Sequence, residues 1–485
     1  MRNKHITSGN QRLTITLFLL GILFCGQLSA QEAQKQKDEV LRVSPNQAVD
    51  MAIKNNLSLE SARISSNTKK RASDLSWNQF IPNVTVAGNL LRDNKESTIS
   101  GMVPVDLSVM APTLPPGSIY GVVPYSVEAP QWHAAGSIQA SLTLSAAMFS
   151  NMKRLRLDYQ TGMISFAKAK AQLERDVRKA YNNMLLLQEN ISLLKENFDA
   201  AGRRVTMAQA NYRAGLVPEL TFLQAQVARE NMKPLIDQAE NGLRLSRAQF
   251  AMFLGLPYDS PFELEPVKSE TDFISFNVQD LISKAASGKP DIQELRYSIL
   301  LLHSVRKTQL NSLLPALTLS WNMMPTFMGD PMKDSMGDMD KWKDQGGRFT
   351  ISLGLRLNSL LPFSMDFQGV KNMDDQIVGA NIGLAQMIRG TEIEIYNTVL
   401  ALEKTRISVE AQTQTIRLAE RSYRLSEQAY RAGLQDLLQV RNAELDLKQA
   451  RVSMLEQQFN YLNGLLDLEY AIGVPFGTLS SKEIK

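Results

Sequence analysis

The chain has 485 residues, and its 53 basic against 49 acidic side chains give a formal charge of only +4. A chain this close to neutral lacks the basic field that attracts nucleic acid. Its single cysteine, Cys25, excludes intrachain disulfide bonds and metal sites built from several thiolates.

The first thirty residues have the pattern of a secretory signal peptide. Arg2, Lys4 and Arg12 precede an apolar run at 13–25, and small residues then lead to Ala30. We expect cleavage after Ala30, because this run is shorter than the about 20 residues that a membrane-spanning helix needs. The mature chain would begin with a polar segment at 31–43, and its export is the first functional expectation.

Cys25 admits a second interpretation as a lipidation site, although Phe24 before it is bulkier than such sites usually accept. If the signal peptide is removed, 50 basic and 49 acidic residues and no thiol remain. Cysteine nucleophiles and thiolate metal ligands are then excluded.

The sequence contains two copies of one unit. Tyr-Arg-Ala-Gly-Leu occurs at 212–216 and again at 430–434, a shift of 218 positions. The same shift aligns Leu220 with Leu438, Ala225 with Ala443, and 255–257 with 473–475. A second alignment, with a shift of 233, covers the beginning of each copy: it aligns Ala52 with Ala285, Leu59 with Ile292, Arg63 with Arg296, and Pro82 with Pro315. We interpret this as a duplication. The first repeat spans 44–257, a linker 258–276, the second repeat 277–475 and a C-terminal tail 476–485.

Each repeat contains a very long helix. Residues 151–212 lack proline and are rich in strong helix formers, and their apolar side chains recur at alternating spacings of three and four. These positions are Val177, Ala180, Met184, Leu187, Ile191, Leu194, Phe198, Ala201, Val205, Ala208 and Tyr212. At ~1.5 Å per residue this helix would measure roughly 90 Å.

The corresponding helix at 366–430 keeps only half of that apolar pattern, because Thr398, Thr405 and Gln412 occupy alternate positions. Two interpretations remain open: an ordinary coiled coil with a weakened stripe, or a helix whose flank faces water inside a tube. Each long helix ends at a glycine turn, at 212–216 and 430–434, and a second helix follows at 217–254 or 435–471. Glycine permits the left-handed backbone that ends many helices.

Before each long helix the apolar period changes to two. The expected hairpins are 83–147, with strands at 84–90 and 137–146, and 316–358, with strands at 317–323 and 349–358. A half-buried soluble sheet gives the same alternation, but four strands of about membrane-crossing length in an exported chain favour an outer-membrane barrel. Four strands cannot close a barrel and open edges are excluded from lipid, so several chains would each contribute four strands.

The ordered duplication of hairpin, long helix, glycine turn and helix resembles the TolC family of outer-membrane efflux proteins, from about Ser44 to Pro475. The resemblance implies a mixed α and β membrane protein: a homotrimer with a twelve-stranded β-barrel, continued by an α-helical coiled-coil barrel across the periplasm. It also implies a passive duct for efflux or type I secretion, with no cofactor. The implied partners are outer-membrane lipid, a periplasmic adaptor and an inner-membrane transporter.

The resemblance further implies roles for the turns. Adaptor docking would involve one set of residues in each repeat: Tyr212, Arg213, Ala214, Gly215 and Leu216, and Tyr430, Arg431, Ala432, Gly433 and Leu434.

A periplasmic gate would involve Tyr430 and the positions of the family's charged residues. In this chain, Gln435 occupies the position of the family's gate arginine, and Thr221 occupies the position of its acidic partner. Gln439 and Asn442 occupy the positions of the family's acidic rings. The charged interactions that hold the family's gate closed, which we call the latch, are therefore in doubt. Asp436 lies close enough to replace them in part.

Other classes fit less well. An enzyme is disfavoured because the mature chain keeps only His133 and His303 and has no glycine-rich phosphate loop. A periplasmic adaptor would have one helical hairpin, whereas a non-channel coiled-coil scaffold of the envelope remains the alternative. The loop at 323–340 holds six methionines and four aspartates, a composition suited to Cu(I), but a flexible surface loop is the simpler interpretation.

Overall fold

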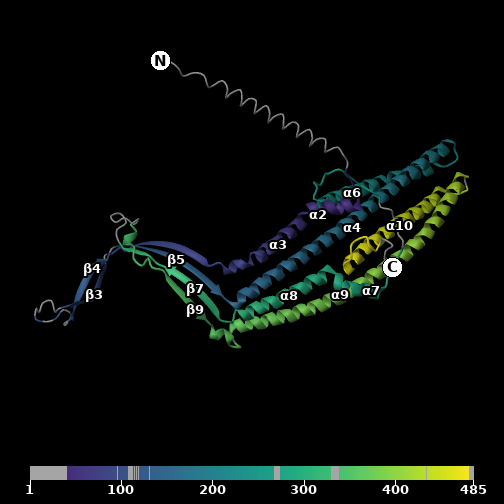
Figure 1. Ribbon diagram of the computed structural model, residues 1–485. Coiled ribbons are helices and arrows are strands. Elements are labelled where there is room, and N and C mark those ends of the chain that lie inside the picture. Colours follow the sequence, from purple (N-terminus) through teal and green to yellow (C-terminus); the bar gives the residue numbers. More distant parts are fainter. Residues whose placement is uncertain are drawn as a thin grey trace, which may run out of the picture. The chain divides into compact units, whose positions relative to one another are not determined.

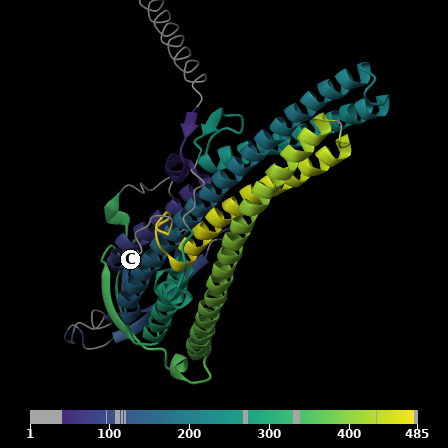
Figure 2. The ribbon, with the colours of Figure 1, turned by 90° about the vertical axis from the view of Figure 1, so that its right-hand side faces the viewer.

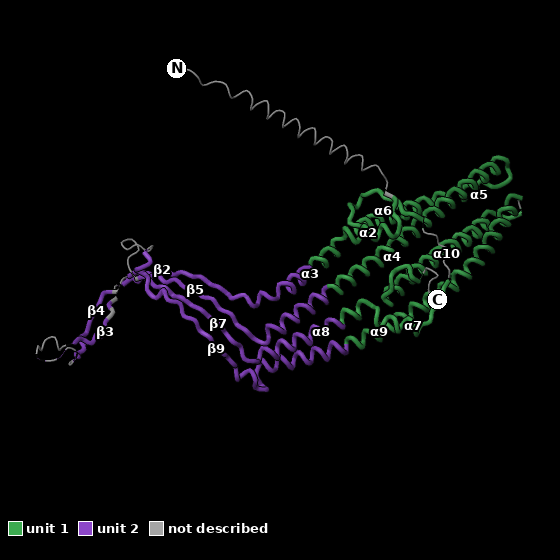
Figure 3. The backbone as a smooth tube through the Cα atoms, viewed as in Figure 1, with its two compact units in different colours: residues 1–66, 163–295, 383–485 green, residues 67–162, 296–382 purple. Residues whose placement is uncertain are grey.

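The computed structural model describes residues 41–479 except 96, 107–112, 114, 116, 118–119, 130, 267–272, 329–337 and 433. The expected signal peptide, Cys25 and half of the methionine-rich loop, 329–337, lie outside the described residues. The chain forms two compact units, of which unit 1 comprises 1–66, 163–295 and 383–485, and unit 2 comprises 67–162 and 296–382 (Figure 3). Among the described residues, no helix combines the length and apolar character needed to span a membrane.

The helices and strands follow one another along the chain as labelled in Figure 1. The first half consists of β1 (Leu41–Val43), α2 (Pro45–Asn55), α3 (Leu57–Asp74), η1 (Ser76–Phe80), β2 (Asn83–Arg92), β3 (Ser97–Asp106), β4 (Tyr120–Ala129), β5 (Trp132–Leu144), α4 (Ala146–Arg213), α5 (Glu219–Glu230) and α6 (Lys233–Leu254). The second half consists of β6 (Phe262–Leu264), α7 (Val278–Gly288), α8 (Pro290–Asn311), β7 (Ala316–Met323), β8 (Thr326–Met328), η3 (Met339–Lys341), β9 (Arg348–Gly354), η4 (Leu357–Leu360), α9 (Met365–Arg431) and α10 (Leu437–Ile472).

Unit 2 contains an antiparallel sheet in the order β2, β5, β7, β9, with the short β8 beside β5. The register aligns apolar residues across β5, β7 and β9: Trp321 lies between Ala140 and Phe349, and Leu319 lies between Leu142 and Ile351. The intervening row pairs Thr143 with Thr318, and their hydroxyl groups are 3.2 Å apart. Because side chains alternate between faces, the sheet has one apolar and one polar face, as the period of two predicted.

Several boundaries differ from the sequence expectation. A second antiparallel pair, β3 and β4, is inserted between β2 and β5, and the strand expected at 349–358 ends at Gly354, ahead of the 3-10 turn η4. The expected polar segment at 31–43 contributes β1, and the expected linker at 258–276 contributes β6. These two strands pair in parallel.

Two helices also differ from the expectation. The first long helix begins at Ala146 rather than 151, since 146–150 continue its first turns without a helix breaker. The helix expected at 217–254 is interrupted between Glu230 and Lys233, because Pro234, in the first turn of α6, cannot donate a backbone hydrogen bond inside a continuous helix.

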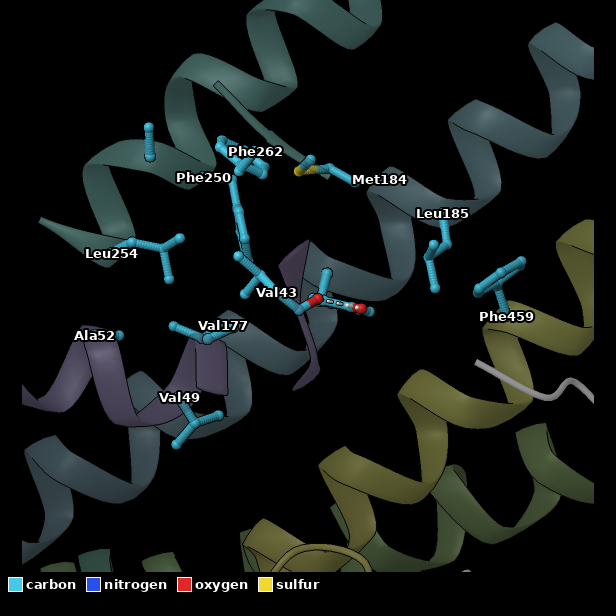
Figure 4. Packing of buried hydrophobic residues seen from close by; sticks show 13 residues of the cluster. Val43, Val49, Ala52, Val177, Met184, Leu185, Phe250, Leu254, Phe262 and Phe459 are labelled. Carbon is cyan, nitrogen blue, oxygen red and sulfur yellow. Dashed lines mark hydrogen bonds between the residues drawn. The ribbon is translucent and has the colours of Figure 1, made fainter. Parts of the chain in front are cut away.

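The core of unit 1 lies where α2, α4 and α6 meet (Figure 4). Phe250 and Leu254 of α6 pack with Val177 and Met184 of α4, and all four are at most 1% exposed. The Tyr181 hydroxyl donates to the Val43 carbonyl at 2.9 Å, which fixes β1 on this core. A second cluster packs α7 against α9 and α10. The apolar positions of α4 therefore face partners within the chain.

Candidate functional site

The first glycine turn connects α4 to α5. Gly215 has φ +70, and the Leu216 N–H donates to the Asn211 carbonyl at 2.8 Å. This is the six-residue bond of a Schellman C-cap, which needs a left-handed residue at the glycine position. The ring of Tyr212 stacks on Phe222 with an interplanar angle of 4° and a centroid distance of 6.2 Å. The turn is thus ordered by its own backbone and by an aromatic pair, and Leu216 remains exposed.

The second turn, between α9 and α10, reproduces the same backbone bond. The Leu434 N–H donates to the Ala429 carbonyl at 2.9 Å, and both residues are 218 positions from their first-turn counterparts. Arg431 forms an ion pair with Glu427 at 2.7 Å, one helical turn back. Gly433 lies outside the described residues. Both turns belong to unit 1 and lie at the same end of its helices (Figures 1 and 2).

The two turn tyrosines have different environments. Tyr212 is 40% exposed, whereas Tyr430 is 7% exposed, and the position of Phe222 is taken in the second copy by the buried Val440. The Tyr430 hydroxyl is buried and has no hydrogen-bond partner among the described residues. Burial raises the pKa of Tyr430, so the phenol stays neutral at physiological pH. The second turn therefore carries an unsatisfied donor that the first turn lacks.

Four of the expected gate residues, Gln435, Asp436, Gln439 and Asn442, lie at the start of α10, whereas Tyr430 lies at the end of α9. Asp436 is the N-cap of this helix, and its carboxylate accepts the backbone N–H of Gln439 at 2.9 Å. The Gln435 side-chain amide donates to the Gln439 side-chain oxygen, while the Gln435 side-chain oxygen is buried and has no hydrogen-bond partner among the residues that the structure describes. Asp436 thus already has a structural role as a helix cap. Thr221 lies on α5, and in the described part of the chain no hydrogen bond joins its side chain to Gln435.

A charged cleft above the turns was missed by the sequence reasoning. It has a volume of about 350 Å³ and lies between α4, α9 and α10. Arg204 pairs with Glu444 at 2.5 Å with both side chains less than 15% exposed, and Arg451 contacts Glu420 at 3.0 Å and Glu196 at 3.6 Å. The sequence offered one signal for these ion pairs: Arg204 directly precedes Val205, a position of the apolar pattern, and so lies next to the packed face of the helix. These pairs fix α10 between α4 and α9.

A second ionic cluster lies farther from the turns. The Lys168 ammonium is 2.8 Å from both Asp291 and Glu294, and the Tyr470 hydroxyl donates to Asp291 at 2.8 Å. Burial acts to lower the pKa of Lys168, but hydrogen bonds to the two carboxylates outweigh it and raise this pKa. Burial likewise acts to raise the pKa values of Asp291 and Glu294, and Lys168 reverses this, so both are lowered. This cluster joins α4, α8 and α10.

The described residues contain no group of three histidine, cysteine, aspartate or glutamate side chains that could hold a metal ion. The site consists instead of two exposed turns, a polar cluster at the start of α10 and ion pairs between helices.

Residues 48–256 match the model of the family described as Outer membrane efflux protein. No curated protein sequence matches the chain. Among solved structures, CusC, whose structure is described in terms of folding and transmembrane channel formation, superposes with TM-score 0.69 at 14% identity, covering 89% of this chain and 92% of that chain.

Two further structures give a similar result. The CmeC outer membrane channel of Campylobacter jejuni has TM-score 0.66 at 15% identity, with 88% and 85% of the two chains covered. The outer membrane protein VceC of Vibrio cholerae has TM-score 0.66 at 14% identity, with 89% and 96% covered. At these sequence identities, the structural similarity shows that this chain has the same fold as those proteins. Residues 48–256 thus match the model of the outer membrane efflux protein family, and the chain shares the fold of these outer membrane proteins along most of its length.

Proposed function

We propose that this protein is the passive exit duct of a tripartite efflux or type I secretion system in the outer membrane. Its substrates would come from an inner-membrane transporter through a periplasmic adaptor. The observation that carries the proposal is the four-stranded antiparallel sheet, whose apolar residues share one face while hydroxyl and amide side chains share the other. Such a sheet suits lipid on one side and water on the other.

The sheet also supports a homotrimer. Among the described strands, β2 and β9 each have a neighbour on one side only, so each leaves one row of backbone groups without a strand partner. In lipid these groups must pair, and pairing with copies of the same chain satisfies them. Three chains would give the twelve-stranded barrel that the resemblance implies.

The two turns are the proposed docking points for the adaptor. The side chains of Leu216 and Leu434 are 73% and 82% exposed at equivalent positions, so each turn presents an apolar contact at its tip. The proposed gate lies between the end of α9 and the start of α10, where Tyr430 and Gln435 have buried polar atoms with no hydrogen-bond partner in the described part of the chain. Such unpaired groups cost free energy, which favours a second packing arrangement in which they find partners.

The test is the double variant Gly215→Val and Gly433→Val. Valine in the left-handed region costs on the order of 1–2 kcal/mol and adds bulk where the adaptor would dock. We expect a trimer in the outer membrane that has lost adaptor co-purification and resistance to exported drugs. The matched control is Gly390→Val, because Gly390 lies within α9 in open space.

Three measurements decide the outcome. Adaptor binding and export that survive in the double variant would contradict the docking role of the turns. Native mass measurement in detergent that finds only monomers would contradict the trimer. Wild-type protein that conducts no ions in a planar bilayer would favour the coiled-coil scaffold instead.

A further inference from the structure

One end of the four-stranded sheet, which we call its base, adjoins four helix ends of unit 2. Helices α3 and α8 end, and α4 and α9 begin, next to the base (Figures 1 and 3). Lys69 of α3 forms an ion pair with Asp158 of α4 at 2.9 Å. Arg306 of α8 forms an ion pair with Asp374 of α9. The four helix ends are therefore packed in two pairs at the base of the sheet.

Large apolar side chains are exposed at the base of the sheet. We call them the apolar belt, and they are 50–92% exposed: Trp77, Phe149, Leu314, Leu357, Phe363 and Met365. Each lies either in a segment that connects a strand to a helix or in the first turn of that helix. The apolar belt thus extends the exposed apolar surface beyond the ends of the strands.

The height of the sheet indicates which layer of a membrane would surround its base. Strand β2 has ten residues. At ~3.4 Å per residue and a tilt of about 40°, this strand would rise roughly 25 Å, which is the height of the apolar band in outer-membrane barrels. The sheet alone can therefore cross the hydrocarbon layer. The surface just beyond its base would then lie in the headgroup layer, which is about 5–8 Å deep on each side of a bilayer.

Exposed basic side chains follow directly after the apolar belt. We call them the basic belt, and among the described residues none of them forms an ion pair: Lys70, Lys153, Arg156, Lys307, Arg356 and Lys371. Lys153 lies about 10 Å beyond the start of α4, and Lys307 lies about 6 Å before the end of α8. Their long side chains can extend along apolar surface, so the charged groups can reach the headgroup layer.

Basic and apolar side chains share the same sides of the helices. Phe149, Lys153 and Arg156 are spaced by four and three residues, which places them on one side of α4. The Lys371 ammonium lies 5.5 Å from the centre of the Phe367 ring, one helical turn earlier in α9. Large exposed apolar side chains are unfavourable in a water-filled bore. This shared side therefore suits the lipid around the barrel.

The two ends of the sheet differ in the sign of their charge. Ten basic and five acidic residues occur in the segments at the base: 69–82, 146–158, 303–315 and 355–375. Four basic and nine acidic residues occur in the segments at the opposite end, 93–131 and 323–347. The basic surplus is therefore specific to the base of the sheet and does not follow from the small charge of the whole chain.

We infer that the two belts bind anionic phospholipid headgroups in the periplasmic leaflet of the outer membrane. Lysine and arginine donate hydrogen bonds to phosphate oxygens, and a cluster of several basic side chains beside a membrane attracts anionic lipids. The apolar belt would lie at the level where the acyl chains begin. An anionic periplasmic polymer such as peptidoglycan would satisfy the basic belt but leave the apolar belt in water.

This inference rests on the proposed duct, because it requires the sheet to lie in the outer membrane with the helices in the periplasm. It adds the class of lipid that the protein prefers and the side chains that select it. A zwitterionic headgroup carries its own ammonium group, which the basic belt would repel. The belt should therefore discriminate between anionic and zwitterionic phospholipids.

The test is quenching of tryptophan fluorescence by brominated phospholipids in bilayers that contain the full-length protein. Trp77 of the apolar belt becomes the only tryptophan in the variant Trp132→Phe, Trp321→Phe and Trp342→Phe. In equal mixtures of phosphatidylglycerol and phosphatidylethanolamine, bromine on the anionic lipid should quench Trp77 about two-fold more strongly than bromine on the zwitterionic lipid. A concentration of ~0.5 M salt should reduce this preference, because exposed charges are screened.

The belt variant carries four substitutions, which should abolish the preference for phosphatidylglycerol: Lys153→Gln, Arg156→Gln, Lys307→Gln and Lys371→Gln. The matched control loses the same charge from four exposed basic residues of unit 1, and it should keep the preference: Lys54→Gln, Arg389→Gln, Lys404→Gln and Arg417→Gln. Native mass spectrometry of the same proteins with all tryptophans retained counts the bound phosphatidylglycerol molecules. This second measurement decides the comparison where the tryptophan changes prevent folding.

The outcomes separate this inference from the proposed function. A protein that retains only Trp321, on the apolar face of the sheet, should be quenched by both lipids, and no quenching by either would contradict the outer-membrane duct itself. Equal quenching of Trp77 by the two lipids, or an unchanged preference in the belt variant, overturns the lipid preference and leaves a conducting duct intact. Co-sedimentation with purified peptidoglycan that only the belt variant loses, without a lipid preference, would assign the basic belt to that polymer and overturn the inference.

Discussion

Gly473, at the C-terminal end of α10, is expected to be far more sensitive to alanine substitution than Gly215. It has φ +71, so any side chain there is strained, and a Cβ atom would lie 2.1 Å from the Gly288 carbonyl oxygen. Gly288 ends α7, and its own Cβ would lie 2.4 Å from the Ile472 carbonyl oxygen. The two helix ends approach so closely that each needs glycine.

The magnitude follows from two contributions. The left-handed conformation costs a non-glycine residue roughly 1–2 kcal/mol. Overpacking against backbone, which cannot rotate away as a side chain can, adds roughly 1–3 kcal/mol. We expect Gly473→Ala to destabilise unit 1 by about 2–5 kcal/mol. Gly215→Ala has the same strain, since its φ is +70, but nothing lies within 4 Å of its Cβ position, so it should cost only about 1–2 kcal/mol.

The assay is thermal unfolding of the detergent-solubilised protein, followed by circular dichroism at one fixed scan rate because unfolding of large proteins is often irreversible. Gly473→Ala should unfold at a clearly lower temperature than Gly215→Ala, and Gly215→Ala should lie close to the wild type. Equal losses in the two variants would refute the reasoning, because they would show that strain alone matters and that α7 and α10 do not approach closely.

Two further predictions concern charge. In the folded protein, the pKa values of Asp291 and Glu294 lie below their ordinary values of 3.8 and 4.5. The resulting stability is present at pH values above these ordinary pKa values and is lost as the pH falls through the lowered ones. Lys168→Met should therefore cost roughly 1–3 kcal/mol at neutral pH and flatten the loss of stability that unfolding measurements give as the pH falls below the ordinary pKa values of 3.8 and 4.5; an unchanged loss of stability at acid pH would contradict this account. Gln439→Asp with Asn442→Asp should lower single-channel conductance when multivalent cations are present, because convergent carboxylates bind hard cations. Identical block in variant and wild type would show that these positions do not line the pore.

The sequence by itself determined the elements that depend on local periodicity. The alternation in 349–354 placed Phe349, Ile351 and Leu353 on one face, and the register of β7 and β9 confirms it. The spacing of three and four from Val177 to Ala208 indicated the long helix α4, because side chains on one helix face must recur at that period. Gly215 ends this helix in the left-handed conformation that its position after the apolar pattern predicted.

Only the tertiary structure decided which apolar faces are covered and which polar groups meet. Periodicity in α9 marks Ile395 and Ile407 alike as apolar, yet the first is 0% exposed and the second 59% exposed, because α7 and α10 cover only one side of the helix. Asp436 was a candidate for the latch but caps α10, and Arg204 finds Glu444 some 240 residues away. Partners so distant in sequence leave no local pattern, since their contact depends on the order in which whole helices pack.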